Sequence, residues 1–192
     1  MGVLESVRAR GPLRSLRPLI NQRDRIATAQ KMIKACNHLS IPIHSTTQSS
    51  AKLGPVCNEL SNPTTPLDPI DKTRFSMFVP PLSTTALPES SDIAIVGIET
   101  HICVTQTALD LLRAGKGHRV YVLADGVSSC NRGEVGVALR RLAREGAVVT
   151  TSESWLYECL GDAGDEGFKE IAKLVKDTKE STRDAVETLC KM

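Results

Sequence analysis

Hydrophobic residues along the chain follow two alternating patterns. Short, nearly continuous apolar runs, of which residues 93–98 are the clearest, are typical of strands buried on both faces of a parallel sheet. Between these runs, apolar residues such as Val104, Ala108 and Leu111 recur three or four positions apart, which predicts amphipathic helices. We therefore expect helices at 22–39, 103–114, 134–145 and 165–190, and strands at 41–47, 70–72, 92–98, 119–124 and 147–151.

The order of these elements predicts the fold class. Strands that alternate with helices of ten or more residues indicate βαβ units, in which helices cover both faces of a parallel sheet. We therefore expect an α/β fold, a three-layer α/β/α sandwich with a mostly parallel sheet. A chain of 192 residues is long enough to bury a core as one domain.

Composition and charge exclude several classes of function. A net charge of +2 and an aromatic content of 3% give no basis for nucleic-acid binding, so we expect no nucleic-acid partner. No apolar run approaches the roughly 18 residues of a membrane span, so we expect no membrane partner. The six cysteines are widely separated and have no spacing typical of a zinc site, so we expect no metal.

The cysteines and the N-terminus also bear on location. Without a signal-peptide pattern, scattered cysteines favour reduced thiols in an intracellular compartment, and the cytoplasm is our first expectation. Residues 1–25 are rich in arginine and poor in acids, which is also typical of a mitochondrial transit peptide. Pro12 and Pro18 interrupt any helix there, which weighs against targeting.

One cysteine stands where a chemical role is expected. Cys103 follows the buried strand 92–98 and opens the helical pattern that comes next. It therefore lies at the carboxyl edge of the predicted sheet, where α/β folds bind their ligands. Unpaired N–H groups at a helix N-terminus favour the thiolate, which is the nucleophilic form of the side chain. The alternative interpretation is a buried, inert cysteine.

Three segments resemble a known family. The sequences DKTRFSMF (71–78), GIETHICVTQ (97–106) and VLADGVSS (122–129) are similar to those of the isochorismatase-like cysteine hydrolases, in the branch of isochorismatase domain-containing proteins. The resemblance extends from about Arg17 to the C-terminus, so we divide the chain into an atypical basic segment, 1–16, and a hydrolase domain, 17–192. It implies the fold predicted above, a small-molecule substrate, no cofactor and a homo-oligomer.

The resemblance also implies a set of site residues. The family uses a triad of Asp, Lys and Cys that cleaves the C–N bond of small amides, and Cys103 and Lys72 match two of its members. The family has a cis peptide that here falls between Ile98 and Glu99, and it directs the N–H groups of Glu99 and Cys103 toward a developing oxyanion. Further positions are expected to line the substrate pocket: Gln48, Thr100 and His101. A surface Gln that caps a turn is the alternative for Gln48.

The third triad member is missing. In the family, the Asp ends an apolar first strand that lies centrally in the sheet, between the strands expected here at 41–47 and 92–97. In this chain about residues 11–13 hold that place, and no apolar strand precedes them. We therefore expect the first strand to be absent or replaced, and its two neighbours to lose a row of hydrogen bonds. The N-terminus is truncated or misread, residues 1–11 form a poor substitute, or the enzyme has decayed; we favour the first explanation.

Three functions therefore compete. The first is a cysteine hydrolase that uses Cys103 and Lys72, with activity impaired by the missing Asp. The second is a catalytically inactive interaction domain that keeps the fold and oligomerises, which the absent Asp favours. The third is a redox-responsive protein that uses the Cys103 thiol. The Lys72 partner favours hydrolysis over the redox function.

Overall fold

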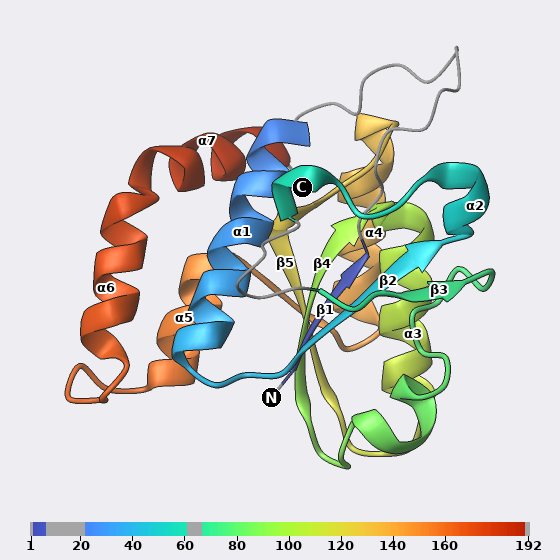
Figure 1. Cartoon of the computed structure of the whole chain (residues 1–192), viewed down its shortest axis with the longest axis horizontal. Coiled ribbons are helices and arrows are strands. Elements are labelled where there is room, and N and C mark those ends of the chain that lie inside the picture. Colours follow the sequence, from blue (N-terminus) through green and yellow to red (C-terminus); the bar gives the residue numbers. More distant parts are fainter. Residues whose placement is uncertain (1, 7–21, 61–66, 191–192) are drawn as a thin grey trace.

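A single parallel sheet organises the protein, as the computed structural model in Figure 1 shows for residues 2–6, 22–60 and 67–190. The strand order is β3-β2-β1-β4-β5-β6, and every neighbouring pair is parallel. The strands are β1 (Gly2–Ser6), β2 (Ile43–Gln48), β3 (Ile70–Lys72), β4 (Asp92–Ile98), β5 (Arg119–Ser128) and β6 (Val148–Thr150).

Helices cover both faces of this sheet. One face packs against α3 (Thr105–Arg113) and α4 (Arg132–Arg144), through core residues such as Ile95, Val122 and Leu139. The other face packs against α1 (Gln22–His38), α5 (Ser152–Leu160) and α6 (Phe168–Asp177), through residues such as Val96 and Trp155. The predicted three-layer α/β sandwich is confirmed. The short α2 (Ser50–Leu53) follows β2, and α7 (Lys179–Leu189) ends the fold.

The centre of the sheet corrects one expectation from the sequence. Residues Gly2–Ser6 form β1, which pairs in parallel with β2 on one side and with β4 on the other. The expected loss of a row of hydrogen bonds is therefore wrong, and β1 agrees with the alternative in which residues 1–11 substitute for the first strand. This strand is hard to recognise from its sequence because a run of five residues, GVLES, contains only two large apolar side chains.

The C-terminal third also differs from the sequence prediction. The single helix expected at 165–190 is divided into α6 and α7, which meet at Thr178. Helix α5 was not predicted, although Thr151 is a helix-capping residue whose hydroxyl accepts a hydrogen bond from the N–H of Ser154. Trp155 and Leu156 of α5 are buried against the sheet, so this helix completes the core on the α1 side.

No helix in the described part of the chain combines the length and the apolar character that crossing a membrane requires. Helices α1, α3, α4, α5 and α6 instead bury one face each in the core beside the sheet, as amphipathic helices do.

A buried polar cluster joins α1, β5, α5 and α7. The Lys31 ammonium donates to the hydroxyl of Thr182 on α7 (2.8 Å) and lies 3.9 Å from the Asp125 carboxylate on β5. Asp125 accepts hydrogen bonds from both the N–H and the hydroxyl of Ser152, at the start of α5. Burial lowers the pKa of Lys31, and the charges of Asp125 and Glu153 act in the opposite direction.

This cluster generates a prediction about stability. Lys31→Met leaves the Asp125 carboxylate buried without its cation, and removing one partner of a buried ion pair costs about 3 kcal/mol. We expect the free energy of unfolding, measured by urea denaturation, to fall by about that amount. Lys34→Met is the matched control, because Lys34 lies on the same helix with an exposed side chain and its loss should change stability by less than about 0.5 kcal/mol. Equal effects of the two substitutions would contradict the prediction.

Candidate functional site

The sheet changes its direction of growth between β1 and β4. From β1 the chain adds β2 and β3 on one side, whereas β4, β5 and β6 extend the other side. A crevice forms at the carboxyl ends of the strands at such a switch point, and α/β folds bind ligands there. Gln48 and Lys72 end β2 and β3, and Cys103 follows β4. Only β1 separates β2 from β4, which places these two strands about 10 Å apart.

Cys103 lies in a tight turn between β4 and α3. The peptide bond between Ile98 and Glu99 is cis, and residues Thr100–Val104 then form a single π-helical turn. The Glu99 carbonyl accepts hydrogen bonds from the N–H groups of Ile102 (3.0 Å) and Val104 (3.2 Å). Helix α3 begins at Thr105, so Cys103 precedes the regular helix by two residues. Its side chain is only 2% exposed.

Lys72 donates hydrogen bonds to three neutral acceptors. Its ammonium donates to the Gln48 side-chain oxygen (2.7 Å) and to the carbonyls of Arg74 (3.0 Å) and Phe75 (3.1 Å). Gln48 is itself fixed, because its side-chain nitrogen donates to the Thr73 carbonyl (2.7 Å). Both Lys72 and Gln48 are buried, so their amine and amide groups are ordered by the protein.

A threonine connects the cysteine turn with the segment that follows Lys72. The Thr107 hydroxyl donates to the Cys103 carbonyl (2.6 Å) and accepts a hydrogen bond from the N–H of Met77 (2.8 Å). Thr107 is fully buried on α3, where a broken hydrogen bond cannot be replaced by water. This residue was not predicted from the sequence, because a Thr within a helix is normally a solvated or packed side chain.

Two further hydrogen bonds attach the segment after β5 to the cysteine turn. The buried Glu99 carboxylate accepts from the N–H of Cys130 (2.6 Å), and a ring nitrogen of His101 lies 2.9 Å from the Ser129 hydroxyl. Glu99 was predicted only for its backbone N–H. Its side chain, Ser129 and Cys130 were not predicted, although the sequence VLADGVSS ends at Ser129.

The predicted pocket residues differ in how they are used. Both polar atoms of Gln48 bond within the protein, to Lys72 and Thr73, which favours a positioning role. The Thr100 hydroxyl is fully buried and has no hydrogen-bond partner among the described residues, so it retains unused bonding capacity beside Cys103. His101 is half-buried and oriented by Ser129.

Asp71 and Asp24 do not take the place of the missing Asp. The Asp71 carboxylate accepts from the Thr47 hydroxyl and the Ser50 N–H (both 2.8 Å), and these bonds lower its pKa. Adjacent residues of a strand point to opposite faces, so Asp71 and Lys72 are turned apart. Asp24 accepts from Thr188 on α7.

In the described part of the chain, no group of His, Cys, Asp and Glu is arranged to hold a metal ion.

The remaining cysteines near the surface are kept protonated. Burial, followed by the Glu99 charge, raises the pKa of Cys130, and burial raises the pKa of Cys159 to about 12 and that of Cys190 to about 11. A protonated thiol reacts slowly with electrophiles. The environments of these three thiols therefore disfavour the thiolate.

The fold and the site define an α/β protein with a candidate thiol nucleophile at the switch point of its sheet. Residues 16–154 match the isochorismatase domain, and the chain belongs to this family. It is 39% identical over 163 residues to isochorismatase domain-containing protein 2 of Bos taurus. This match covers 84% of this chain and 78% of that protein. It is also 39% identical over 152 residues to the secreted isochorismatase effector Isc1 of Phytophthora sojae. This match covers 76% of this chain and 71% of that protein.

A solved structure agrees with this assignment. The structure of MAR1 ribonuclease from Caenorhabditis elegans superposes with a TM-score of 0.78 at 32% sequence identity, covering 91% of this chain and 89% of that one. The shared fold therefore extends over nearly the whole length of both proteins.

The site generates a prediction about thiol reactivity. We expect Cys103 to be alkylated by iodoacetamide faster than any other cysteine near neutral pH, because it lies on the turn before α3 at the carboxyl edge of the sheet, where α/β folds bind their ligands. Mass-spectrometric mapping of the folded protein measures this order. Cys130 is the internal control, since it is exposed but its raised pKa keeps it protonated. Faster labelling of Cys130, with Cys103 left unmodified, would remove the nucleophile assignment.

Proposed function

We propose that this chain is a cysteine hydrolase that cleaves the C–N bond of a small amide-type substrate. Cys103 is the nucleophile and Lys72 is the cation that supports its thiolate. The observation that carries the proposal is the placement of both residues at the carboxyl edge of the sheet, on either side of the switch point, with Lys72 ordered by Gln48. Membership of the isochorismatase family supports it.

The proposed reaction has two steps. The Cys103 thiolate attacks the amide carbonyl carbon, the C–S bond forms, and the C–N bond breaks as the leaving nitrogen takes up a proton. Water then attacks the thioester, which releases the acid and restores the thiolate. The N–H groups of Glu99 and Cys103 stabilise the oxyanion in both steps, as donors fixed by the backbone of the turn.

The buried contacts assign different tasks to the other residues. Gln48 positions Lys72, because its oxygen accepts from the ammonium and its nitrogen is bonded to Thr73. Thr100 and His101 contact the substrate, since the Thr100 hydroxyl has unused bonding capacity and the His101 ring is oriented by Ser129. No metal or other cofactor takes part. The protein acts in the cytoplasm, with mitochondria as the alternative.

The site lacks the Asp that acts as the acid in the family's triad. The strand β1, whose sequence is GVLES, contains no Asp, and residues 1–23 contain none either. Without the family's Asp to protonate the leaving nitrogen, C–N cleavage is slow even with a reactive thiolate. We therefore propose a hydrolase of impaired activity. Lys72 is ordered by Gln48, and the turn that contains Cys103 is held by Thr107. Both contacts favour an impaired hydrolase over an inactive interaction domain.

The first test concerns Lys72 and Gln48. Lys72→Met removes the cation, so the pH profile of Cys103 alkylation should move to higher pH by about one unit. Gln48→Leu should move it in the same direction by less, because it removes one of the contacts that position Lys72. Gln48→Glu, which keeps an acceptor for Lys72, should stay closest to the unmodified chain.

Lys52→Met is the control for this experiment, because Lys52 is an exposed lysine on the nearby α2. A profile that Lys72→Met leaves unchanged would mean that Lys72 does not support the thiolate, and the proposed pair would fail.

The second test concerns the missing acid. We expect the chain to hydrolyse simple amides poorly, because general acid–base assistance of C–N cleavage is worth about 10²–10⁴ in rate. Replacing residues 2–15 by an apolar strand that ends in Asp should restore turnover by a factor in that range. The release of the amine measures turnover, and Cys103→Ala is the control that abolishes it. If the chain already turned over amides at the rate of the grafted variant, another residue would be the acid.

A further inference from the structure

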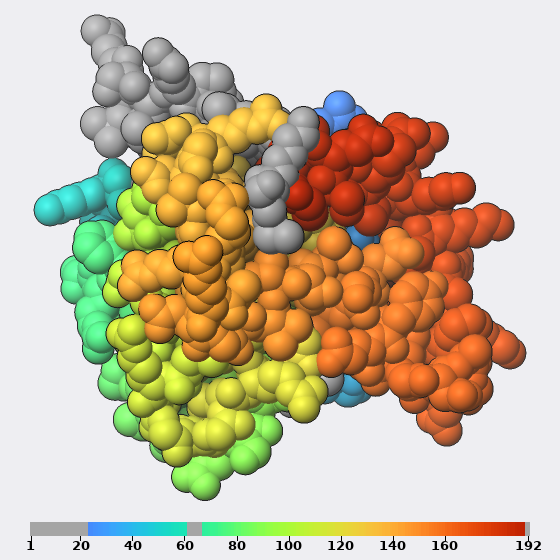
Figure 2. Space-filling view, turned by 180° about the vertical axis from the view of Figure 1, so that it is seen from behind, coloured from blue at the N-terminus to red at the C-terminus, as the bar shows by residue number. Residues whose placement is uncertain are grey.

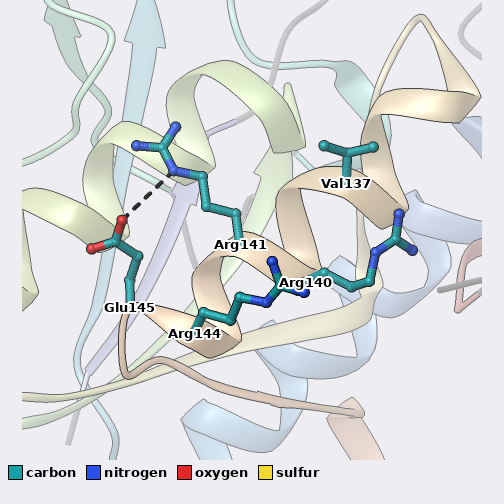
Figure 3. A pocket seen from close by; sticks show the side chains of 5 residues that line it. All are labelled: Val137, Arg140, Arg141, Arg144 and Glu145. Carbon is teal, nitrogen blue, oxygen red and sulfur yellow. Dashed lines mark ion pairs between the residues drawn. The ribbon is translucent and has the colours of Figure 1, made fainter.

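A hollow on the outer surface of α4 is lined almost entirely by charged side chains. It has a volume of about 340 Å³, and all five residues that line it come from one face of α4 and its C-terminus (Figure 3): Val137, Arg140, Arg141, Arg144 and Glu145. Figure 3 shows Arg141 directed toward Glu145, whereas the side chains of Arg140 and Arg144 extend away from Glu145. We call these five residues the α4 arginine face.

The α4 arginine face has an excess of positive charge that its own acid does not cancel. Glu145 is shared by Arg141 (3.8 Å) and Arg113 of α3 (3.4 Å), and the three arginines and one glutamate of this face leave a charge of 3 − 1 = +2. Val137 is 56% exposed among these guanidinium groups. An exposed apolar side chain surrounded by arginines is typical of a binding surface, because Arg is enriched at protein interfaces.

A second charged surface complements this one. The loop between α5 and α6, residues 161–167 (GDAGDEG), has a charge of −3 from Asp162, Asp165 and Glu166, and it contains no basic residue. The side chains of these three acids are exposed. Asp162 and Asp165 each use one oxygen to accept a hydrogen bond from the N–H of Gly164 and Gly167, which orders the loop. We call residues 161–167 the acidic loop.

The two surfaces cannot meet within one molecule. Helix α4 packs on one face of the sheet, and α5 and α6 pack on the other. In Figure 2 the acidic loop projects at the lower right, whereas α4 lies on the left half of the molecule. A contact between them therefore requires two molecules, and it joins unlike surfaces in a head-to-tail arrangement, which closes into a ring or extends as a filament.

We propose that the α4 arginine face binds the acidic loop of a second copy of this chain. The charges are opposite in sign and similar in size, +2 against −3. The ordered loop presents its carboxylates in a fixed arrangement, so little conformational entropy is lost on docking. The whole chain carries only +2, so the arginine face is one half of a segregated charge pattern and does not belong to a generally basic protein.

The proposal is tested on the full chain by sedimentation velocity at low and at high salt. Because the contact is made of exposed ion pairs, the dissociation constant for self-association should rise about tenfold or more with salt. Two charge-reversed variants should each be monomeric: Arg140→Glu/Arg144→Glu on the arginine face, and Asp165→Lys/Glu166→Lys on the acidic loop. Circular dichroism shows whether each variant is folded.

Mixing the two variants provides the decisive measurement. The reversed arginine face and the reversed loop complement one another, so the mixture should form heterodimers that neither variant forms by itself. Lys176→Glu/Lys179→Glu is the matched control for the reversed arginine face. It changes the net charge by the same amount at exposed positions on α6 and α7, and it should leave association unchanged. A monomeric chain, an assembly that survives both reversals, or a mixture that fails to associate would overturn the proposal. So would an arginine face that binds RNA or inorganic phosphate without self-association.

Discussion

The two rows of hydrogen bonds made by the central strand fix the position of everything else in this protein. Strand β1 pairs with β2 on one side and with β4 on the other, and the chain connections run outward from it in both directions. The carboxyl ends of two separately built half-sheets therefore meet around one strand. Lys72 approaches from one half and Cys103 from the other, and neither half alone contains both.

Buried polar contacts then hold the two halves in a defined arrangement. On the site side, Thr107 bonds to the carbonyl of Cys103 and to the N–H of Met77, and so connects the cysteine turn with the segment after Lys72. On the opposite face, Lys31 and Asp125 join α1 to β5 and α7. Each of these groups would be costly to leave unpaired in a dry interior, which makes the arrangement specific as well as stable.

The sequence predicted the parts of the fold that rest on strong local patterns. The apolar run of β4 and the helical spacing of α1, α3 and α4 place those elements within a few residues of their observed bounds. It failed at β1, where five residues with little apolar character are held by pairing on both sides, and at α5, whose burial depends on contacts with α1 and α6. Tertiary contacts outweigh local preference in such short elements.

For the site, the sequence by itself determined which chemical groups are present: a cysteine after a buried strand, a lysine at a strand end, and no aspartate in the first 23 residues. Only the tertiary structure decided what those groups touch. Gln48 is directed to Lys72, Glu99 holds the N–H of Cys130, and Thr107 joins two segments 30 residues apart. The reason is that hydrogen bonds between distant segments depend on strand order and register, which local spacing does not encode.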